Sequence, residues 1–228
     1  MRARLAILAM VVLAGCGTNK PSKTTTTERP PPGGAAVPTG CRSVPKPKAQ
    51  PDGQLARPGT FGTPPARATI QTNCGDIVIA LDTKDQPKTA ASFAYLARKG
   101  FFDGTTFWRV QRTPDGADFV IQGGDPTNSG TGGPGYTITE KPKSSTQYTR
   151  GVVAMAKTEI EKPGTSGSQF FIVTGEDAGL PPDYAVLGKV VGGQAAVQRI
   201  AAARSDPSTG RATQAAVIQK IALGGQGG

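Results

Sequence analysis

The sequence predicts an all-β domain, built as an antiparallel barrel whose two open ends are closed by helices. Three observations favour this fold class. Short strand-like segments recur throughout residues 67–228, glycine-rich turns separate them, and only two stretches space their apolar residues as a helix does. The same residues carry every aromatic side chain except Phe61, so we expect them to hold the core of a single domain.

The domain is expected to open with a β-hairpin followed by a helix. Residues 67–73 and 76–82 alternate apolar and polar side chains, and a Cys-Gly pair between them suits a turn. Pro87 fits the first turn of a helix, where a missing N–H is tolerated. The apolar stripe that follows ends at Gly100, a residue type that commonly terminates helices.

The remaining elements are short strands and one further helix. Strand-like runs cover residues 106–110, 119–122, 152–156, 169–173, 186–191 and 215–223, and residues 136–139 are also strand-like. A second helix is expected near residues 193–202. Many short strands and only two helices are the basis of the barrel prediction.

The N-terminus has the pattern of an export signal. Arg2 and Arg4 precede the apolar run 5–15, which is shorter than the roughly 20 residues that span a bilayer. The run ends in Leu-Ala-Gly before Cys16, which resembles the lipobox of bacterial lipoproteins. We therefore expect residues 1–15 to be a signal peptide and Cys16 to be lipidated. The mature protein would then be extracytoplasmic, with a membrane as partner through its N-terminal lipid.

Residues 16–66 are predicted to form a tether rather than a domain. Residues 17–66 hold eleven of the 20 prolines and lack the apolar runs needed to offset ordering entropy. Once Cys16 is acylated, Cys41 and Cys74 are the only cysteines left to pair in an oxidising compartment. Two free thiols are the alternative. A bridge would pin residues 41–66 to the domain and leave residues 17–40 as the free tether.

The charge distribution argues against a nucleic-acid partner. The formal net charge is +10, and residues 17–66 hold seven lysines and arginines against two acidic residues. A nucleic-acid-binding domain would concentrate its basic residues on the folded part, whereas residues 67–228 are nearly balanced. A basic tail suits an anionic membrane or cell wall equally well.

The absence of histidine narrows the chemistry further. It excludes a Ser-His-Asp triad, an imidazole proton shuttle and a His-ligated zinc or haem, so we expect no metal and no cofactor. Residues 130–135 match a dinucleotide-binding glycine pattern, but Pro134 and a strand-like run follow instead of a helix. Residues 164–168 are serine-containing but have no activating base, so a turn is expected there.

Five separated blocks closely resemble the cyclophilin-type peptidyl-prolyl isomerases in order and spacing. The blocks are residues 107–110 (FWRV), 119–126 (FVIQGGDP), 130–133 (GTGG), 150–156 (RGVVAMA) and 167–172 (GSQFFI), with a further match at 184–190 (YAVLGKV). The resemblance extends over roughly residues 67–224. It implies a closed eight-stranded antiparallel barrel with two capping helices, and acceleration of X-Pro bond rotation as the activity.

The resemblance also implies the site residues. Arg109, Gln122 and Phe119 would be catalytic, with the Arg109 guanidinium near the amide and Gln122 bonded to substrate backbone. The residues implied to bind substrate are Val120, Ala156, Lys157, Gln169, Phe171, Leu180 and Tyr184. Rotation makes and breaks no bond and must overcome only the ~18–20 kcal/mol of amide resonance, so neither nucleophile nor cofactor is required.

The predicted function is therefore a monomeric prolyl isomerase that acts on proline-containing segments of exported polypeptides. The chain departs from the family at Trp108 and Tyr184, where histidine is usual, at Gly179, where an aromatic is common, and by an insertion at residues 111–118. Of these departures, Trp108 and Gly179 suggest the alternative, a catalytically weak proline-peptide-binding module or chaperone.

Overall fold

The structure, a computed structural model, describes residues 34–53 and 55–224. Its elements are β1 (Arg67–Thr72), β2 (Gly75–Leu81), α1 (Pro87–Arg98), β3 (Arg109–Arg112), β4 (Asp118–Gly123), β5 (Ile138–Thr139), β6 (Val152–Met155), β7 (Thr165–Ser166), β8 (Phe170–Val173), β9 (Val186–Gly192), α2 (Gln194–Ala201) and β10 (Ile218–Gly224). The predicted signal peptide and Cys16 lie outside the described residues. No helix within the described ranges is long and apolar enough to cross a membrane.

One antiparallel sheet forms most of the molecule. Its eight strands follow the order β10-β1-β2-β9-β6-β8-β4-β3. The edge strands β3 and β10 form no ladder with each other, and isolated bridges join Thr106 to Val217 and Arg109 to Arg211 instead. The sheet is therefore an open, curled half-barrel, which corrects the expected closed barrel. Separate backbone hydrogen bonds, such as that from the Phe107 N–H to the Ala216 carbonyl at 2.9 Å, join the two edges in place of a ladder.

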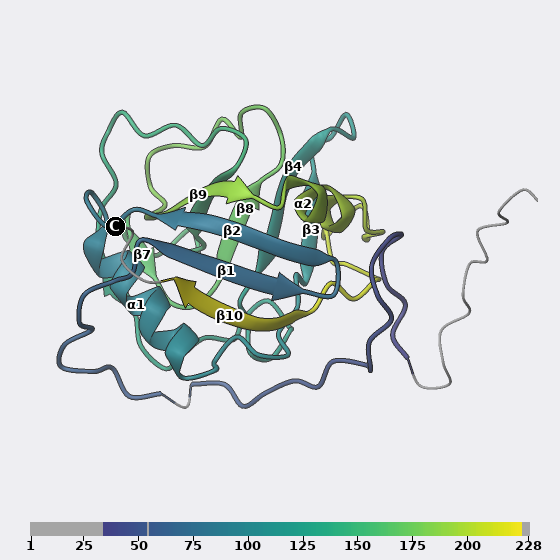
Figure 1. Ribbon diagram of the computed structural model, residues 1–228. Helices are drawn as coiled ribbons and strands as arrows, with labels where there is room; N and C mark the ends of the chain where they lie inside the picture. Colours follow the sequence, from purple (N-terminus) through teal and green to yellow (C-terminus); the bar gives the residue numbers. More distant parts are fainter. Residues whose placement is uncertain (1–33, 54, 225–228) are drawn as a thin grey trace, which may run out of the picture.

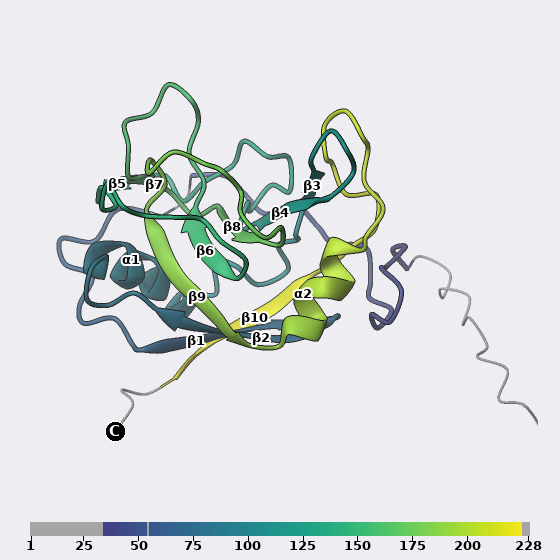
Figure 2. The same cartoon turned by 90° about the horizontal axis from the view of Figure 1, so that it is seen from above.

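The two helices lie at opposite ends of the curled sheet (Figures 1 and 2). Both begin and end close to the predicted residues, since Pro87 is the first residue of α1 and Gly193 precedes α2. The helices bury alanines and a few larger apolar side chains against the sheet, among them Phe93, Leu96 and Ile200. Small side chains on these faces let each helix approach the strands closely.

The inner face of the sheet holds the main hydrophobic core. Four fully buried phenylalanines meet there, with ring centroids 5.0 Å apart for Phe93 and Phe102 and 5.8 Å apart for Phe93 and Phe170. Phe107 packs edge-on against Phe170 at 5.9 Å. Edge-to-face aromatic pairs stabilise a core beyond their buried area, so this cluster fixes the strands that carry the site.

Several local predictions differ from the structure. The strand expected at residues 215–223 begins only at Ile218, and the strand-like run at residues 136–139 is a strand only over Ile138–Thr139. The strand expected at residues 106–110 begins only at Arg109 and continues to Arg112. Part of the expected turn at residues 164–168 is the short strand β7, which pairs with β5. The insertion at residues 111–118 extends the hairpin of β3 and β4, where Arg112 and Asp118 form an ion pair at 2.7 Å.

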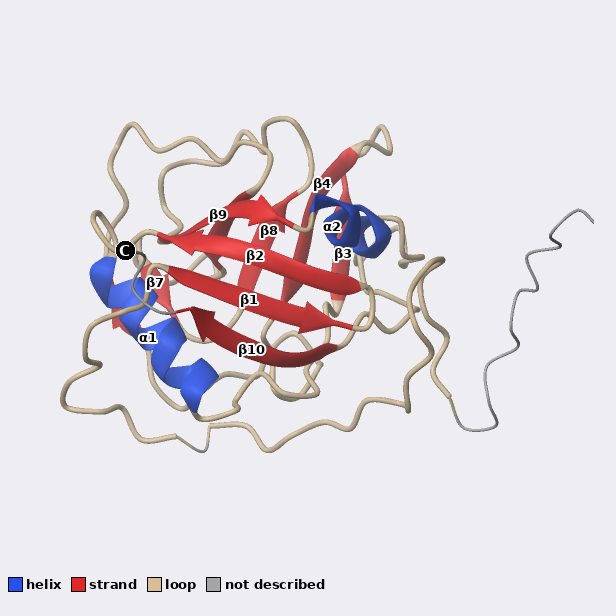
Figure 3. Ribbon diagram, in the orientation of Figure 1, coloured by secondary structure: helices blue, strands red, loops and turns tan. Residues whose placement is uncertain are grey.

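The segment before β1 is held along the surface of the domain (Figures 1 and 3). We call residues 41–53 and 55–66 the strap. A disulfide joins Cys41 to Cys74, and the Arg42 N–H donates to the Asn73 carbonyl at 2.8 Å. Residues of the predicted free tether also make contact, because the Ala215 N–H donates to the Ala36 carbonyl. A disulfide, backbone hydrogen bonds and single apolar side chains such as Phe61, whose ring centroid lies 6.0 Å from that of Tyr95, hold this segment, so no apolar run in the sequence marks the contact.

Candidate active site

Three predicted site residues, Arg109, Gln122 and Phe171, form one row across the sheet together with Ala154. Arg109 on β3 lies opposite Gln122 on β4, Gln122 lies opposite Phe171 on β8, and Phe171 lies opposite Ala154 on β6. Residues directly opposite each other in an antiparallel sheet project to the same face. The strand register therefore places a cation, an amide and an aromatic ring side by side.

Hydrogen bonds fix the polar end of this row. Arg109 donates from Nη1 to Gln122 Oε1 at 3.4 Å and from Nε to Gln111 Oε1 at 3.2 Å. Gln122 Nε2 donates to Gln169 Oε1 at 3.0 Å. The Arg109 side chain is thus oriented by neutral acceptors, and no carboxylate among the described residues is paired with it.

Trp108 belongs to the same network. Its Nε1 donates to Gln169 Oε1 at 3.2 Å, and its ring lies over Gly130, where an added Cβ would be only 2.8 Å from the ring. Gly130 also has a φ of 101°, which favours glycine. The indole therefore helps to set the orientation of the Gln169 amide, a role that could not be assigned to Trp108 from the motif alone.

A second apolar cluster lies beside the row, apart from the main core. Its buried members are Val120, Tyr148, Ala154, Phe171 and Val173, and the less buried Phe119, Val152, Ala156, Ala178, Leu180, Tyr184 and Val186 pack against them. Six predicted site residues are brought together in this cluster. Lys157 lies at its border, with Nζ 5.4 Å from the centroid of the Tyr184 ring.

The electrostatics of the site follow from partial burial. Burial lowers the pKa of the Arg109 guanidinium from its ordinary value, and the nearby Tyr184 opposes that shift. Burial likewise raises the pKa of Tyr184, and Asp183 and Glu159 add to this effect while Arg109 counteracts it. Within residues 34–53 and 55–224, no group of three or more His, Cys, Asp or Glu residues could hold a metal ion.

Comparison with known proteins decides the family. The family described as "Cyclophilin type peptidyl-prolyl cis-trans isomerase/CLD" matches residues 67–223. The chain belongs to this family. A peptidyl-prolyl cis-trans isomerase of Schizosaccharomyces pombe is 36% identical over 162 residues, covering 69% of this chain and 99% of that protein.

Two peptidyl-prolyl cis-trans isomerases named from Mycobacterium tuberculosis are also similar. Peptidyl-prolyl cis-trans isomerase A is 37% identical over 177 residues, covering 69% of this chain and 92% of the relative. Probable peptidyl-prolyl cis-trans isomerase B is 39% identical over 165 residues, covering 66% of this chain and 52% of the relative. The chain thus spans about half the length of this last relative.

Solved cyclophilin structures resemble the fold as well. A cyclophilin type peptidyl-prolyl cis-trans isomerase of Cryptosporidium parvum, crystallised in the presence of the dipeptide Ala-Pro, aligns with a TM-score of 0.62 and 29% identity. The alignment covers 70% of this chain and 99% of that one. The half-barrel is therefore the cyclophilin fold with two helices.

Tyr148 is a site residue that the sequence did not reveal. Its hydroxyl donates to the Tyr184 carbonyl at 2.6 Å and accepts from the Tyr184 N–H at 2.9 Å. Its ring stands edge-on to Tyr184 at 5.9 Å and lies 6.4 Å from Phe171. Tyr148 precedes the family-like block at residues 150–156 by only two residues, but nothing in that block indicated that Tyr184 is its partner.

The position of Gly179 leaves one side of the cluster open. A Cβ at Gly179 would meet no atom within 4 Å, and its φ of 59° favours glycine. Leu180 next to it packs against the second cluster. The rim at Gly179 therefore carries no side chain, while the wall at Leu180 is kept.

Proposed function

We propose that this cyclophilin-family protein accelerates cis-trans isomerisation of X-Pro peptide bonds. The observation that carries the proposal is the cross-strand row of Arg109, Gln122 and Phe171 beside an apolar cluster. A prolyl ring can pack on Phe171 and Val120 while the peptide amide faces Arg109. Relatives named peptidyl-prolyl cis-trans isomerases support the assignment.

Arg109 would act on the twisted amide rather than on the planar one. As the C–N bond rotates, resonance is lost and the amide nitrogen regains a lone pair that can accept a hydrogen bond. A guanidinium stays charged at physiological pH and presents several N–H donors in a plane. Hydrogen bonds from Arg109 to Gln111 and Gln122 hold these donors in place before the substrate binds.

The energies are consistent with this division of roles. Shortening isomerisation from tens or hundreds of seconds to milliseconds needs about 10⁵-fold acceleration, or ~7 kcal/mol. One preorganised donor typically supplies ~2.7–4 kcal/mol. Arg109 can thus account for about half of the acceleration, and positioning of a twisted conformer by the apolar pocket must account for the rest.

A proline-peptide-binding module is the second candidate function. The open rim at Gly179 favours it, because a missing wall holds a twisted peptide less firmly, and turnover depends on that positioning more than binding does. Such a module would bind proline-containing peptides through Phe171 and Val120 without useful turnover. Its clients, like those of the isomerase, would be exported polypeptides.

An isomerase assay separates the two functions. The full chain would be added to a proline tetrapeptide, and the cis-to-trans rate would be followed by coupled proteolysis or by NMR exchange. Acceleration proportional to protein concentration supports the isomerase. Peptide binding seen in an NMR titration without any acceleration would overturn the isomerase proposal and support the binding module.

We also propose that the protein is exported and anchored as a monomer through a lipid on Cys16. The pattern of Arg2, Arg4 and the apolar run before Cys16 supports the proposal. Cys16→Ser should abolish labelling with a palmitate analogue and release the protein from membranes, whereas Cys41→Ser should keep the label. Continued labelling of Cys16→Ser would overturn the anchor, and light scattering of the released chain tests the monomer.

A further inference from the structure

The strap pairs with the loop that borders the site. We call residues 130–135 the glycine loop. The Gly53 N–H donates to the Gly133 carbonyl at 3.0 Å, and the Leu55 N–H donates to the Pro134 carbonyl at 3.0 Å. In return, the carboxylate of Asp52 accepts from the Gly133 N–H at 2.7 Å. Three hydrogen bonds thus tie the strap to the glycine loop.

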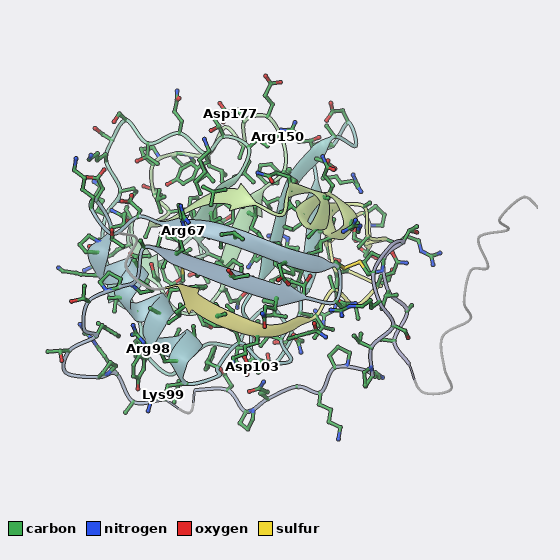
Figure 4. The ribbon with its side chains drawn as sticks, in the orientation of Figure 1. Arg67, Arg98, Lys99, Asp103, Arg150 and Asp177 are labelled. Atoms are coloured by element: carbon green, nitrogen blue, oxygen red, sulfur yellow. A yellow bond between two sulfur atoms is a disulfide. The ribbon has the colours of Figure 1, made fainter. Side chains whose placement is uncertain are left out.

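The contact is close enough to demand glycine on the loop side. A Cβ at Gly135 would lie 2.7 Å from the Gly53 carbonyl oxygen, and the φ of Gly135 is 90°. A second anchor holds the strap nearby, since the Gln50 N–H donates to the Pro126 carbonyl at 2.7 Å. The Gln50 side chain also donates to the backbone carbonyl of Asp103, which lies close to the strap in Figure 4.

The glycine loop in turn holds the network of the row. Gln169 Nε2 donates to the Gly130 carbonyl at 3.0 Å and to the Gly132 carbonyl at 2.9 Å. The other end of that amide, Oε1, accepts from Gln122, whose own oxygen accepts from Arg109. A hydrogen-bonded path therefore runs from Asp52 through the glycine loop to the arginine.

The strap also reaches the cavity next to the row. A cavity of about 650 Å³ lies between the strap and the site, lined by Asp52 and Gly53 on one side and by Gln122, Gln169, Ala156 and Lys157 on others. Four of these lining residues belong to the predicted site. The wall formed by Asp52 and Gly53 comes from outside the part of the chain that matches the family, residues 67–223.

We propose that the strap is part of the catalytic site, with Asp52 as a positioning residue that holds the glycine loop and, through Gln169 and Gln122, the Arg109 donors. This proposal rests on the proposed isomerase function. The disulfide at Cys41 supports the arrangement, because it shortens the free chain that must be ordered when the strap docks.

Substitutions at Asp52 in the full chain test the proposal. Asp52→Ala removes the acceptor for the Gly133 N–H and should lower kcat roughly three- to tenfold, the effect of losing about one hydrogen bond. KM should change less than twofold, since the lost positioning acts in the transition state. Asp52→Asn keeps an oxygen acceptor and should restore most of kcat.

Asp82→Ala is the matched control. The Asp82 carboxylate likewise accepts a backbone N–H, that of Asp85 at 2.9 Å, but it contacts neither the glycine loop nor the network. Its kcat should equal that of the unmodified chain. An Asp52→Ala variant with unchanged kcat, or an Asp82→Ala variant with the same loss, would overturn the positioning role.

An NMR measurement without substrate separates this proposal from the proposed function. The side-chain amide signals of Gln122 and Gln169 should shift in Asp52→Ala and stay in place in Asp82→Ala. Unshifted signals in Asp52→Ala would overturn the positioning role whether or not the protein is an isomerase. Shifted signals in a protein that shows no turnover would overturn the proposed isomerase function and leave the contact between Asp52 and the network standing.

Discussion

Replacing Arg109 with alanine tests the centre of the proposed mechanism. Arg109 is the cation of the cross-strand row, and its donors are held by Gln111 and Gln122 at 3.2 and 3.4 Å. Removing one preorganised donor typically raises a barrier by ~2.7–4 kcal/mol, which corresponds to about 100- to 1,000-fold in rate. We expect kcat/KM of Arg109→Ala to fall within that range.

The fold should tolerate this change. The Arg109 side chain projects from the sheet face opposite the main core and makes no ion pair in the described part of the chain. Its partner Gln122 keeps the hydrogen bond to Gln169 at 3.0 Å when the guanidinium is removed. We therefore expect an unchanged midpoint of thermal unfolding.

Arg112→Ala is the matched control for the assay. Arg112 lies on the same strand, but its guanidinium bonds Asp118 and the Ala201 carbonyl rather than the row. Both variants would be measured with one proline tetrapeptide at several concentrations. An Arg109→Ala protein within threefold of the original kcat/KM, or no more impaired than Arg112→Ala, would refute the assigned role of Arg109.

Three further variants test the pocket, its tyrosine and the strap. Phe171→Ala should raise KM and lower the free energy of unfolding by ~3–5 kcal/mol, because Phe171 is only 4% exposed. The isomerase assay at several peptide concentrations measures KM, and urea unfolding measures the stability. An unchanged KM would show that Phe171 acts only in packing. Burial raises the pKa of Tyr148 to about 12, so the unfolded state ionises first and stability should fall as pH rises from about 10 to about 12. In Tyr148→Phe, this part of the alkaline decline in stability should disappear. Near neutral pH the same variant should have a free energy of unfolding lower by ~1–3 kcal/mol, because the Tyr184 N–H and carbonyl lose their partner. An alkaline decline equal to that of the original chain would contradict the assignment. Replacing Cys41 and Cys74 together by serine frees a loop with a sequence separation of 33 and should lower stability by ~3–4 kcal/mol. Equal urea midpoints of the oxidised original and the double variant would argue that the strap is held without the disulfide.

Local sequence patterns were sufficient for most of the elements. The alternation at residues 67–73 and 76–82 predicted the hairpin of β1 and β2, which pair from Arg67 with Ala80 to Thr72 with Gly75. Pro87 and Gly100 bounded the first helix to within two residues. These predictions succeed because side-chain periodicity and backbone restrictions act over a few neighbouring residues.

The candidate site was accessible from the sequence only through motifs. The five blocks named Arg109, Gln122 and Phe171 together, and the strand register places these residues in one row. The periodicity of apolar residues cannot predict that Arg109 and Phe171 lie side by side, because their strands are distant in the chain. Tyr148 was missed for the same reason, since its partner Tyr184 is 36 residues away.

By itself, the sequence determined where both helices and most strands lie to within a few residues, where the apolar positions lie, and which family blocks are present. Only the tertiary structure decided that the sheet stays open between β3 and β10, and that the strap docks on the glycine loop through Asp52 and Gly53. The open edge and two of the three hydrogen bonds between the strap and the glycine loop depend on backbone N–H and C=O groups, and every residue carries these groups except that proline lacks the N–H. Side-chain patterns therefore do not encode which distant backbone groups meet, and only the packed chain settles their partners.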